Sequence, residues 1–395
     1  MSDLRIACVL GTRPELIKMA PVIRAIRKRA VNVQCIHSGQ HSDLATTAFK
    51  DMGLHADLCL LTRRTDSSVG SLFNSLHGNL HSLFAQDKPA AVLVHGDTST
   101  AWAACMAAFY QGIPVGHVEA GLRCPTLAEP FPEESHRRLI GRLARWHFAP
   151  TQQAAAQLRS ENTQGDIVVC GNTAIDSILT LTRSWAQADH TPCPQLLSAW
   201  QQKQTGGLRP FRLLVTLHRR ENRGQTLINF VRELGQWLSQ SDSHSVIWPL
   251  HANPELQAEI RHAAVEHIAA PLRPRIILTP ALCYADTIWA LAHCDAIATD
   301  SGGLQEEASA FFKPVLILRN STERPEAIQA GYAHLTGCGQ GRLPAAINSI
   351  QQGLWPRKPA EHSPQRWPFG DGNAAERIAS HLLRSLSNIN TAASS

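Results

Sequence analysis

The chain has 395 residues, of which 44% are hydrophobic and 17% charged, and its formal net charge at pH 7 is +5. This length is more than one hydrophobic core supports and indicates two or three domains; the composition is that of an ordinary globular protein. The positive charge is spread along the chain and forms no basic block, so nucleic acid is not an expected partner. A mild positive bias does suit an anionic small-molecule substrate.

The cysteines and the apolar runs indicate the cellular compartment. The ten cysteines form no Cys-x-x-Cys pair, which argues against a zinc ribbon or a thioredoxin-type site and favours buried, reduced thiols. No signal-peptide pattern precedes Arg5, and no apolar run reaches the ~18 residues that a membrane-spanning helix needs. We therefore expect a cytoplasmic protein without a membrane partner.

Short apolar runs bounded by turn residues alternate along the chain with longer amphipathic stretches. Continuous apolar strands alternating with helices are typical of parallel sheets covered on both faces, so the expected fold class is α/β. The predicted strands are 6–10, 31–36, 91–94, 114–118, 146–149, 167–169, 213–217, 245–250, 276–278, 296–299 and 315–318. The predicted helices include 16–28, 69–86, 100–111, 227–239 and 374–386, and residues 387–395 are expected to fray.

The interval 184–210 interrupts this alternation. It contains Pro192, Pro194 and Pro210 together with two adjacent glycines, and such residues end helices and strands. We place the connection between two α/β domains of similar size near this interval.

The stretch from Asp300 to Glu307 follows a predicted strand and leads into a helix. A helix start leaves backbone N–H groups without partners, and with the helix dipole these suit a phosphate. Gly302 and Gly303 let an anion approach without a Cβ in the way, and Glu307, one turn later, is placed to bond a ribose hydroxyl. The alternative is an ordinary strand–turn–helix with glycine at the bend.

Polar clusters of this kind follow strands in both halves of the chain. Ligands of open parallel sheets bind beyond the carboxyl ends of the strands, so a cleft between the two domains is the expected site. The clusters are 11–15, 95–98, 119–121, 218–222, 251–253 and 300–307.

Several kinds of site lack their sequence patterns. There is no Gly-x-Gly-x-x-Gly after a strand, no Walker loop and no Asp-x-Asp, so neither a nicotinamide cofactor nor a metal–diphosphate site is expected. The pairs His77/His81 and His37/His41 have no clear third ligand, and we expect no metal.

The remaining candidates are three acids and a set of cations. Carboxylates facing cations across a cleft fit acid–base work on a substrate whose leaving group is an anion. The acids are Asp97, Glu119 and Glu133, and the cations are Arg13, Lys18, His218, Arg220, His251 and Arg324.

Each candidate also has a plainer interpretation. Asp97 and Glu133 stand where they can cap the helices that begin at Thr98 and Pro132. Arg13 and Lys18 can be solvated residues at a helix start, although cations are disfavoured at that end of a helix, which favours an anionic partner.

In these sequence blocks the chain resembles the UDP-N-acetylglucosamine 2-epimerases of the non-hydrolysing, bacterial type. The resemblance extends from Gly11 to Gly372 and rests on several blocks in the family's order, a combination far more specific than any single block. The blocks are 11–15 with Lys18, 94–98, 117–123, 132–134, 171–173, 218–222, 300–307 and 322–326.

The resemblance implies two Rossmann-like domains in the B-type glycosyltransferase arrangement, with the active site in the interdomain cleft. The implied limits are 1–174 for the first domain, with 366–395 packing back on it, and 175–365 for the UDP-binding domain. It also implies a homodimer without a cofactor.

The resemblance also implies roles for the candidate residues. UDP would bind mainly to the second domain, and the sugar would lie against the first. The implied contacts are Ser301, Gly302, Gly303, His218 and Arg13 for the diphosphate, Glu307 for the ribose, Arg324 for the nucleotide end, and Lys18, Asp97, Glu119 and Glu133 for the sugar.

The chemistry that the family is understood to use is elimination of UDP to a 2-acetamidoglucal, followed by re-addition with the opposite configuration at C2. Asp97, Glu119 and Glu133 are candidate acid and base in an unassigned order, and His218 would assist at the departing diphosphate.

Two segments depart from the family pattern. The chain has Gln40-His41-Ser42-Asp43-Leu44 where relatives usually carry Gln-His-Arg-Glu-Met, which helps to bind a second, activating UDP-GlcNAc. Gln40, His41 and Glu134, with Arg220 and His251, are compatible with such a site, but Ser42 and Asp43 predict weak or absent activation. Near the uracil, Leu282 and Thr287 replace the usual aromatic residue or Gln, so backbone groups would make that contact.

Other functions remain open on the sequence. A UDP-2,3-diacetamido-glucuronate 2-epimerase shares most of the blocks, and a hydrolysing 2-epimerase would release ManNAc and UDP. A B-type glycosyltransferase is disfavoured because acids on the sugar side would serve no evident acceptor, and a silent nucleotide-sugar sensor is disfavoured because all three acids are present.

Overall fold

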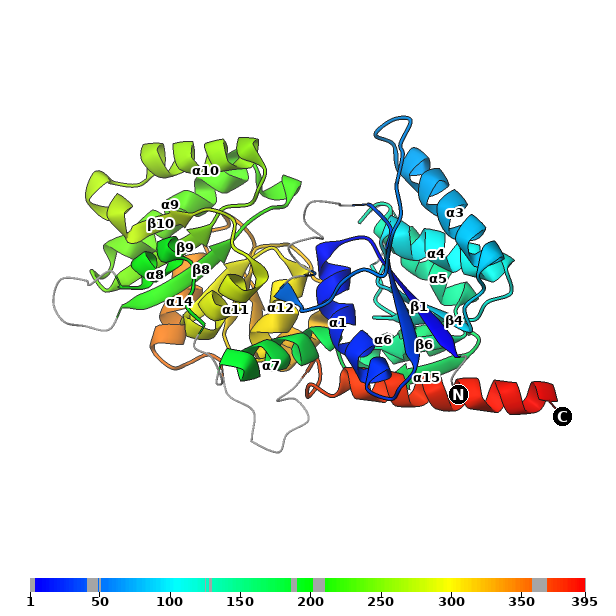
Figure 1. Ribbon diagram of the computed structural model, residues 1–395. Coiled ribbons are helices and arrows are strands. Elements are labelled where there is room, and N and C mark those ends of the chain that lie inside the picture. The colour runs from blue at the N-terminus through cyan, green and yellow to red at the C-terminus, as the bar shows by residue number, and fades with distance from the viewer. Residues whose placement is uncertain are drawn as a thin grey trace. The chain divides into compact units, whose positions relative to one another are not determined.

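The structure, a computed structural model, describes residues 4–40, 49, 51–124, 126–127, 130–185, 190–201, 210–356 and 368–394. The chain forms two compact units, Met1–Thr180 with Phe369–Ser395, and Leu181–Pro368. Each unit contains one parallel sheet with helices (Figure 1), which confirms the predicted α/β class. The chain passes from the first unit to the second within helix α7 (Thr173–Trp185). Among the described residues, no helix is both long and apolar enough to cross a bilayer.

The first unit has a seven-stranded sheet in the order β3-β2-β1-β4-β5-β6-β7. Its strands are β1 Arg5–Leu10, β2 Asn32–His37, β3 Leu58–Cys59, β4 Ala91–His95, β5 Val115–Val118, β6 Trp146–Ala149 and β7 Asp166–Val169. Every residue of β4, β5 and β6 is buried, as expected for strands covered on both faces. Its helices are α1 Arg13–Arg27, α3 Val69–Gln86, α4 Ser99–Tyr110, α5 Glu133–Leu143, α6 Gln152–Ser160 and α15 Ala374–Ser394.

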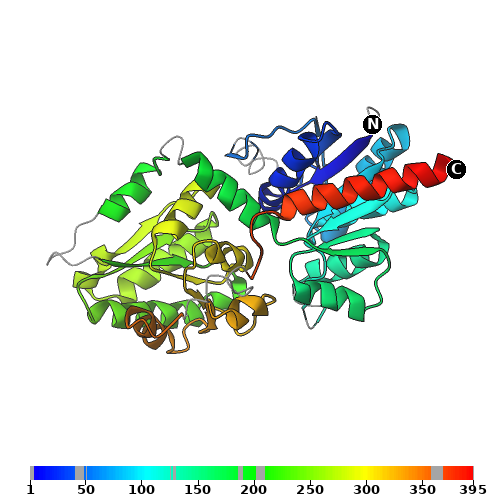
Figure 2. The same ribbon diagram turned by 90° about the horizontal axis from the view of Figure 1, so that it is seen from below.

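Helix α15 brings the end of the chain back to the first unit, where it packs against α1 (Figures 1 and 2). Asp176 holds its beginning, because the carboxylate accepts hydrogen bonds from the N–H groups of Ala374 and Ala375 at 3.2 and 2.9 Å. The helix continues to Ser394, so the expectation that it frays from residue 387 is wrong. The 2.9 Å hydrogen bond from Trp146 Nε1 to Ser385 reaches nearly to the expected end, and just beyond that end the Ser387 hydroxyl donates to the Leu383 carbonyl at 3.0 Å.

The second unit has a six-stranded sheet in the order β10-β9-β8-β11-β12-β13. Its strands are β8 Phe211–Thr216, β9 His244–Pro249, β10 Ile276–Thr279, β11 Ala296–Thr299, β12 Val315–Ile317 and β13 Ala333–Leu335. Its helices are α8 Pro194–Gln201, α9 Gln225–Ser239, α10 Pro254–His267, α11 Tyr284–His293, α12 Gly302–Ser309, α13 Pro325–Gln329 and α14 Leu343–Gln351, with 3₁₀ turns η1 Arg220–Asn222 and η2 Ala270–Arg275. Its largest fully buried side chains are Trp237, Trp248, Tyr332 and Phe230.

Candidate active site

In the first unit, polar residues collect where β1, β4 and β5 end. These three strands are neighbours in the sheet, so the loops that follow them meet at one edge. Arg13 begins α1 after β1, Asp97 follows β4, and Glu119 follows β5. The sheet order therefore brings together residues that lie far apart in the sequence.

Glu119 is the centre of a buried cluster. Its carboxylate forms an ion pair with Lys18, and the two side chains are 12% and 9% exposed. Asn172 Nδ2 donates to the same oxygen at 3.3 Å, and His95 Nε2 lies 3.6 Å from it. The backbone of Glu119 has φ 63°, a region that non-glycine residues seldom adopt and that is often found at functional sites.

Asp97 is held by residues of α5. Arg137 forms an ion pair with its carboxylate, and His136 Nδ1 lies 2.9 Å from its carbonyl oxygen. The cap of α4 is Thr98, whose hydroxyl accepts from Ala101 N–H at 3.0 Å. The interpretation of Asp97 as a helix cap is therefore wrong.

Glu133 is the first residue of α5 and is only partly buried. Pro132 occupies the cap position, and no side chain there makes a capping bond. Within the part of the chain that the structure describes, the Glu133 carboxylate has no hydrogen-bond or ion-pair partner. It is thus the least restrained of the three acids.

The neighbouring Glu134 is fully buried and joins several groups. It pairs with Arg137 at 3.1 Å and with Arg138 at 2.6 Å, and it accepts the N–H of Cys124 at 2.9 Å. Through Arg137 it supports Asp97.

Two other residues were expected beside a second nucleotide. The Gln40 amide oxygen accepts from Thr100 N–H at 3.2 Å and from the Thr100 hydroxyl at 2.7 Å. His41 lies outside the described residues.

Among the candidate cations, Arg13 and Arg220 have free side chains in the part of the chain that the structure describes. Arg13 stands at the positive end of α1 and Arg220 begins η1, and neither guanidinium has a hydrogen-bond or ion-pair partner among the described residues. A cation without a partner at a helix start is stabilised by a bound anion, so the placement of Arg13 supports an anionic ligand.

In the second unit, Asp300 organises the end of β11. It is fully buried and accepts from His218 N–H at 3.0 Å, Arg219 N–H at 2.9 Å and Asn222 Nδ2 at 3.0 Å. His218 Nδ1 lies 2.6 Å from the other carboxylate oxygen. Burial alone would raise the pKa of Asp300, but the hydrogen bond and charge of His218 and the backbone N–H groups hold it below its usual value.

His218 is thereby oriented for a ligand. Its side chain is 39% exposed, and with Nδ1 committed to Asp300 the other ring nitrogen is available. His251 stacks on it with ring centroids 6.0 Å apart. Burial, and then the neighbouring His218, lower the pKa of His251, so this ring favours the neutral state.

The start of α12 supplies backbone donors. The N–H of Ser301 donates to the Thr299 hydroxyl at 2.9 Å, whereas those of Gly302 and Gly303 belong to the first turn, which has no helical acceptors. A Cβ on Gly302 would lie 2.4 Å from Arg324 Nη1, while one on Gly303 would meet nothing within 4 Å. Glycine at 302 therefore makes room for the guanidinium.

Two carboxylates hold Arg324 against α12. Its Nε donates to Glu306 at 2.7 Å, it also pairs with Glu323, and it is 8% exposed. Burial acts to raise the pKa of Glu323, but Arg324 and Arg319 lower it to about 2. Glu307, the expected ribose contact, is partly exposed on the same helix.

The residues expected near uracil are on or beside α11. Thr287 uses its hydroxyl to donate to the Cys283 carbonyl at 2.8 Å, and Leu282 is partly buried just before the helix.

Sequence reasoning named no site role for Glu15, Arg137, Asn172, Asp300 or Glu306. The sequence did give a reason to consider Asp300, since this residue directly follows a predicted strand and begins the polar cluster 300–307. Each of the other four has a partner that is distant in the chain, as with Asn172 and Glu119, which are 53 positions apart.

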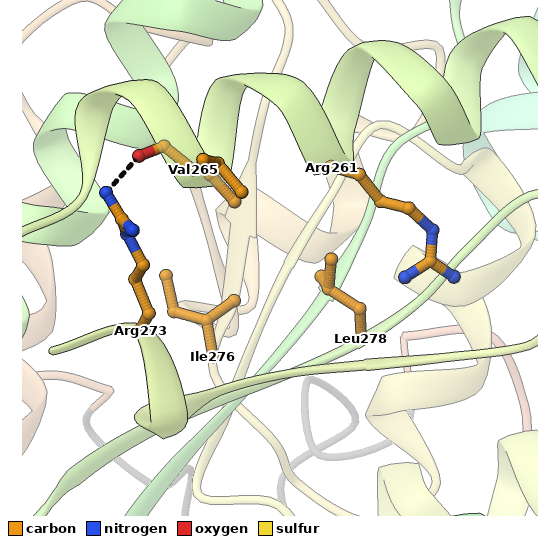
Figure 3. A pocket seen from close by; sticks show the side chains of 6 residues that line it. Arg261, Val265, Arg273, Ile276 and Leu278 are labelled. Carbon is orange, nitrogen blue, oxygen red and sulfur yellow. Dashed lines mark hydrogen bonds between the residues drawn. The ribbon is translucent and has the colours of Figure 1, made fainter. Parts of the chain in front are cut away.

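Two further features are separate from these clusters. No group of three or more His, Cys, Asp and Glu side chains in the described ranges is arranged to hold a metal. A pocket of about 310 Å³ lies against α10, η2 and β10 (Figure 3). It is lined by Arg261, Ala264, Val265, Arg273, Ile276 and Leu278, and none of the candidate residues lines it.

Parallel sheets, a glycine-containing helix start and acid–cation clusters beyond the strand ends define a two-domain α/β protein with sites for an anionic ligand. Residues 24–383 match the family model described as UDP-N-acetylglucosamine 2-epimerase. The chain belongs to this family.

Known proteins similar to the chain cover nearly its full length. A Bacillus subtilis UDP-N-acetylglucosamine 2-epimerase is 36% identical over 385 residues, which is 97% of this chain and 96% of that protein. The crystal structure of the Neisseria meningitidis UDP-GlcNAc 2-epimerase bound to UDP-GlcNAc has a TM-score of 0.82 at 32% identity and covers 96% of this chain and 100% of that one. The Methanocaldococcus jannaschii UDP-GlcNAc 2-epimerase, in complex with UDP-GlcNAc and UDP, has a TM-score of 0.79 at 27% identity and covers 96% and 100%. These similarities confirm the predicted two-domain fold, which is like that of B-type glycosyltransferases.

Proposed function

We propose that the protein interconverts UDP-GlcNAc and UDP-ManNAc by inverting C2 of the sugar without net hydrolysis. Family membership fixes the class of reaction, and one observation in the structure carries the assignment of residues. Two carboxylates, Asp97 and Glu119, follow neighbouring strands, and each is paired with a buried cation, Arg137 or Lys18.

The reaction needs more than one proton-transfer group. The hydrogen on C2 is not next to a carbonyl, so its removal is coupled to departure of UDP. One carboxylate takes the C2 proton, the C1–O bond breaks with its electron pair leaving on UDP, and a C1=C2 double bond forms. UDP then adds back to C1 as a proton reaches the opposite face of C2. Asp97, Glu119 and Glu133 supply the acid and the base.

The second unit supplies the diphosphate site. We assign the N–H groups of Gly302 and Gly303 and the side chains of His218 and Arg13 to the departing diphosphate. One well-placed donor to developing charge is worth ~3 kcal/mol, so these groups favour both cleavage and recapture. Retention of UDP distinguishes this reaction from the hydrolysing form.

The proposed partner is a second copy of the chain. Helices α3 and α4 contain 18 and 12 residues and no charged side chain, and Phe109 and Tyr110 at the end of α4 are 52% and 60% exposed. An uncharged face can pair with its own copy without like-charge repulsion. Sedimentation analysis of the purified protein is expected to give twice the monomer mass, and a monomer at micromolar concentration would exclude this partner.

The activity is tested by incubating the purified protein with UDP-GlcNAc in heavy water and following the sugar by NMR. An epimerase incorporates deuterium at C2 of a UDP-sugar, whereas a hydrolysing enzyme releases free ManNAc. A glycosyltransferase or a sensor leaves C2 unexchanged, and either result would refute the proposal. A parallel sample with the UDP-2,3-diacetamido-glucuronate sugar identifies the substrate by the faster exchange.

A further inference from the structure

Glu15 has a buried carboxylate that joins two loops of the first unit. Its Oε2 accepts from Gly11 N–H at 3.0 Å, Thr12 N–H at 2.8 Å and the Thr12 hydroxyl at 2.9 Å. Its Oε1 accepts from the Thr98 hydroxyl at 2.7 Å. The side chain is 1% exposed, so water competes little for these bonds.

Helix capping explains only part of this arrangement. Glu at the third position of α1 commonly accepts the N–H of the cap residue, here Thr12, and that accounts for Oε2. The bond from Oε1 to Thr98 does nothing for α1, because Thr98 is 83 positions away in the loop after β4. The second oxygen instead joins the loop that precedes Arg13 to the loop that carries Asp97.

A buried carboxylate is a costly way to make this connection. Burial raises the pKa of Glu15 to about 7, and the groups that oppose this shift are hydroxyls and backbone N–H groups of Thr98, Gly11 and Thr12. Glu15 forms no ion pair among the described residues. A cap alone is satisfied by a smaller neutral side chain without this desolvation, and it leaves the 2.7 Å bond between Thr98 and Oε1 unexplained.

We propose that Glu15 is a positioning residue that, through Thr98, fixes Asp97 relative to Arg13. The inference rests on the proposed function, in which Asp97 works at C2 and Arg13 meets the diphosphate. His136 and Arg137 hold Asp97 from the side of α5, and the bond between Thr98 and Glu15 adds a restraint from the side of α1. A displacement of about 1 Å in such a group is enough to slow a reaction about 100-fold.

The test removes the connection without touching a group that meets substrate. Thr98→Val deletes the hydroxyl that bonds Glu15, and Thr98→Ser keeps it. Because Thr98 also caps α4, Thr151→Val is the matched control: Thr151 caps α6 in the same way, accepting from Ala154 N–H at 3.1 Å. Each variant is first checked by circular dichroism and thermal unfolding.

We expect Thr98→Val to lower kcat at least about 10-fold, with KM and the Kd for UDP changed less than about threefold. Thr98→Ser should recover kcat to within about twofold, and Thr151→Val should leave kcat within about twofold of wild type. Equal effects of Thr98→Val and Thr151→Val on kcat would overturn the inference. If Thr98→Val does not fold, Thr98→Ala replaces it.

A double-variant cycle supplies an independent criterion. If Glu15 acts on turnover through Thr98, the loss of kcat in the Glu15→Gln/Thr98→Val pair will be smaller than the product of the two single losses. A loss of kcat in the double variant equal to the product of the two single losses would show that the residues act separately and would refute the inference. Absence of deuterium exchange in the wild-type protein would instead refute the proposed function, so the two failures are distinguishable.

Discussion

The carboxylate of Asp300 lies 2.6 Å from Nδ1 of His218, and the two residues follow adjacent strands, β11 and β8. A carboxylate at Nδ1 accepts the proton carried there and fixes the ring orientation, and in the protonated ring Nε2 is a donor to an anion. The remaining nitrogen then faces its ligand in a defined state. This relationship makes Asp300 a positioning residue for the histidine that we assign to the diphosphate.

Replacing Asp300 should therefore impair turnover. In Asp300→Asn a neutral amide replaces the carboxylate that fixes the His218 ring, and we expect kcat to fall at least about 100-fold. Asp295→Asn is the matched control, because Asp295 precedes the same strand and accepts Arg212 N–H at 2.8 Å at its other end. Initial rates and thermal unfolding of both variants test whether a loss of kcat is specific to Asp300. Near-wild-type kcat in Asp300→Asn would contradict the assignment of Asp300 as a positioning residue for His218.

Asp97→Asn should separate chemistry from nucleotide binding. The substitution removes a proton-transfer group paired with Arg137, so kcat is expected to fall by about 10²–10⁴-fold. The Kd for UDP, measured by calorimetry, should stay within about threefold, because the nucleotide is assigned to the second unit. Parallel losses of kcat and UDP affinity would count against Asp97 as acid or base.

The two glycines of α12 should respond differently to alanine. In Gly302→Ala the new Cβ would lie 2.4 Å from the Arg324 guanidinium, and overpacking of this kind costs about 1–3 kcal/mol. Gly303→Ala meets nothing within 4 Å, and alanine in a helix is favoured by up to about 1 kcal/mol. Thermal unfolding should therefore give a lower midpoint for Gly302→Ala than for Gly303→Ala, and the reverse order would disprove the packing argument.

Asp176 predicts a pH dependence of stability. Burial raises its pKa from 3.8 to about 6 despite the N–H bonds from Ala375 and Ala374. Between these pH values the native carboxyl holds more protons than the unfolded one, so its contribution to the free energy of unfolding falls as pH rises, by at most about 1.4 kcal/mol per pH unit. Asp176→Asn removes this term. The stability of wild type relative to Asp176→Asn should thus decrease from pH 4 to pH 6 in chemical unfolding, and a constant difference would refute the prediction.

Activation by substrate is expected to be weak. Ser42 and Asp43, which depart from the family pattern, lie outside the described residues, and the Gln40 amide oxygen is occupied by Thr100. Initial rates against UDP-GlcNAc concentration should follow a hyperbola. A clearly sigmoidal curve would mean that the second nucleotide site works without the usual Arg-Glu pair.

The fold was predictable where strands are buried on both faces. All eleven predicted strands are present, because unbroken apolar runs such as β1 and β4 are stable only when they are buried on both faces. β3 was missed because it has only two residues. β13 was missed because its three residues include the exposed His334, whereas the equally short β12 is wholly apolar and buried.

The site was predictable only as a set of strand ends. The order of the strands in the sheet determines which loops meet, and short-range sequence patterns do not reveal that order. The pairing of Lys18 with Glu119 depends on β1, β4 and β5 being neighbours, and the link from Glu15 to Thr98 depends on the same order. Residue types and loops could therefore be named in advance, whereas their partners could not.

The packing of α15 has a consequence for synthesis of the protein. Glu376 pairs with Arg29 at 2.7 Å, and His381 lies 2.9 Å from Asp166, so a segment translated after the whole second unit completes the first unit. The first unit must wait, with the surface of α1 uncovered, while nearly 190 residues of the second unit are translated. Premature termination or a bulky fusion near residue 374 would thus damage the packing of the first unit as well as helix α15.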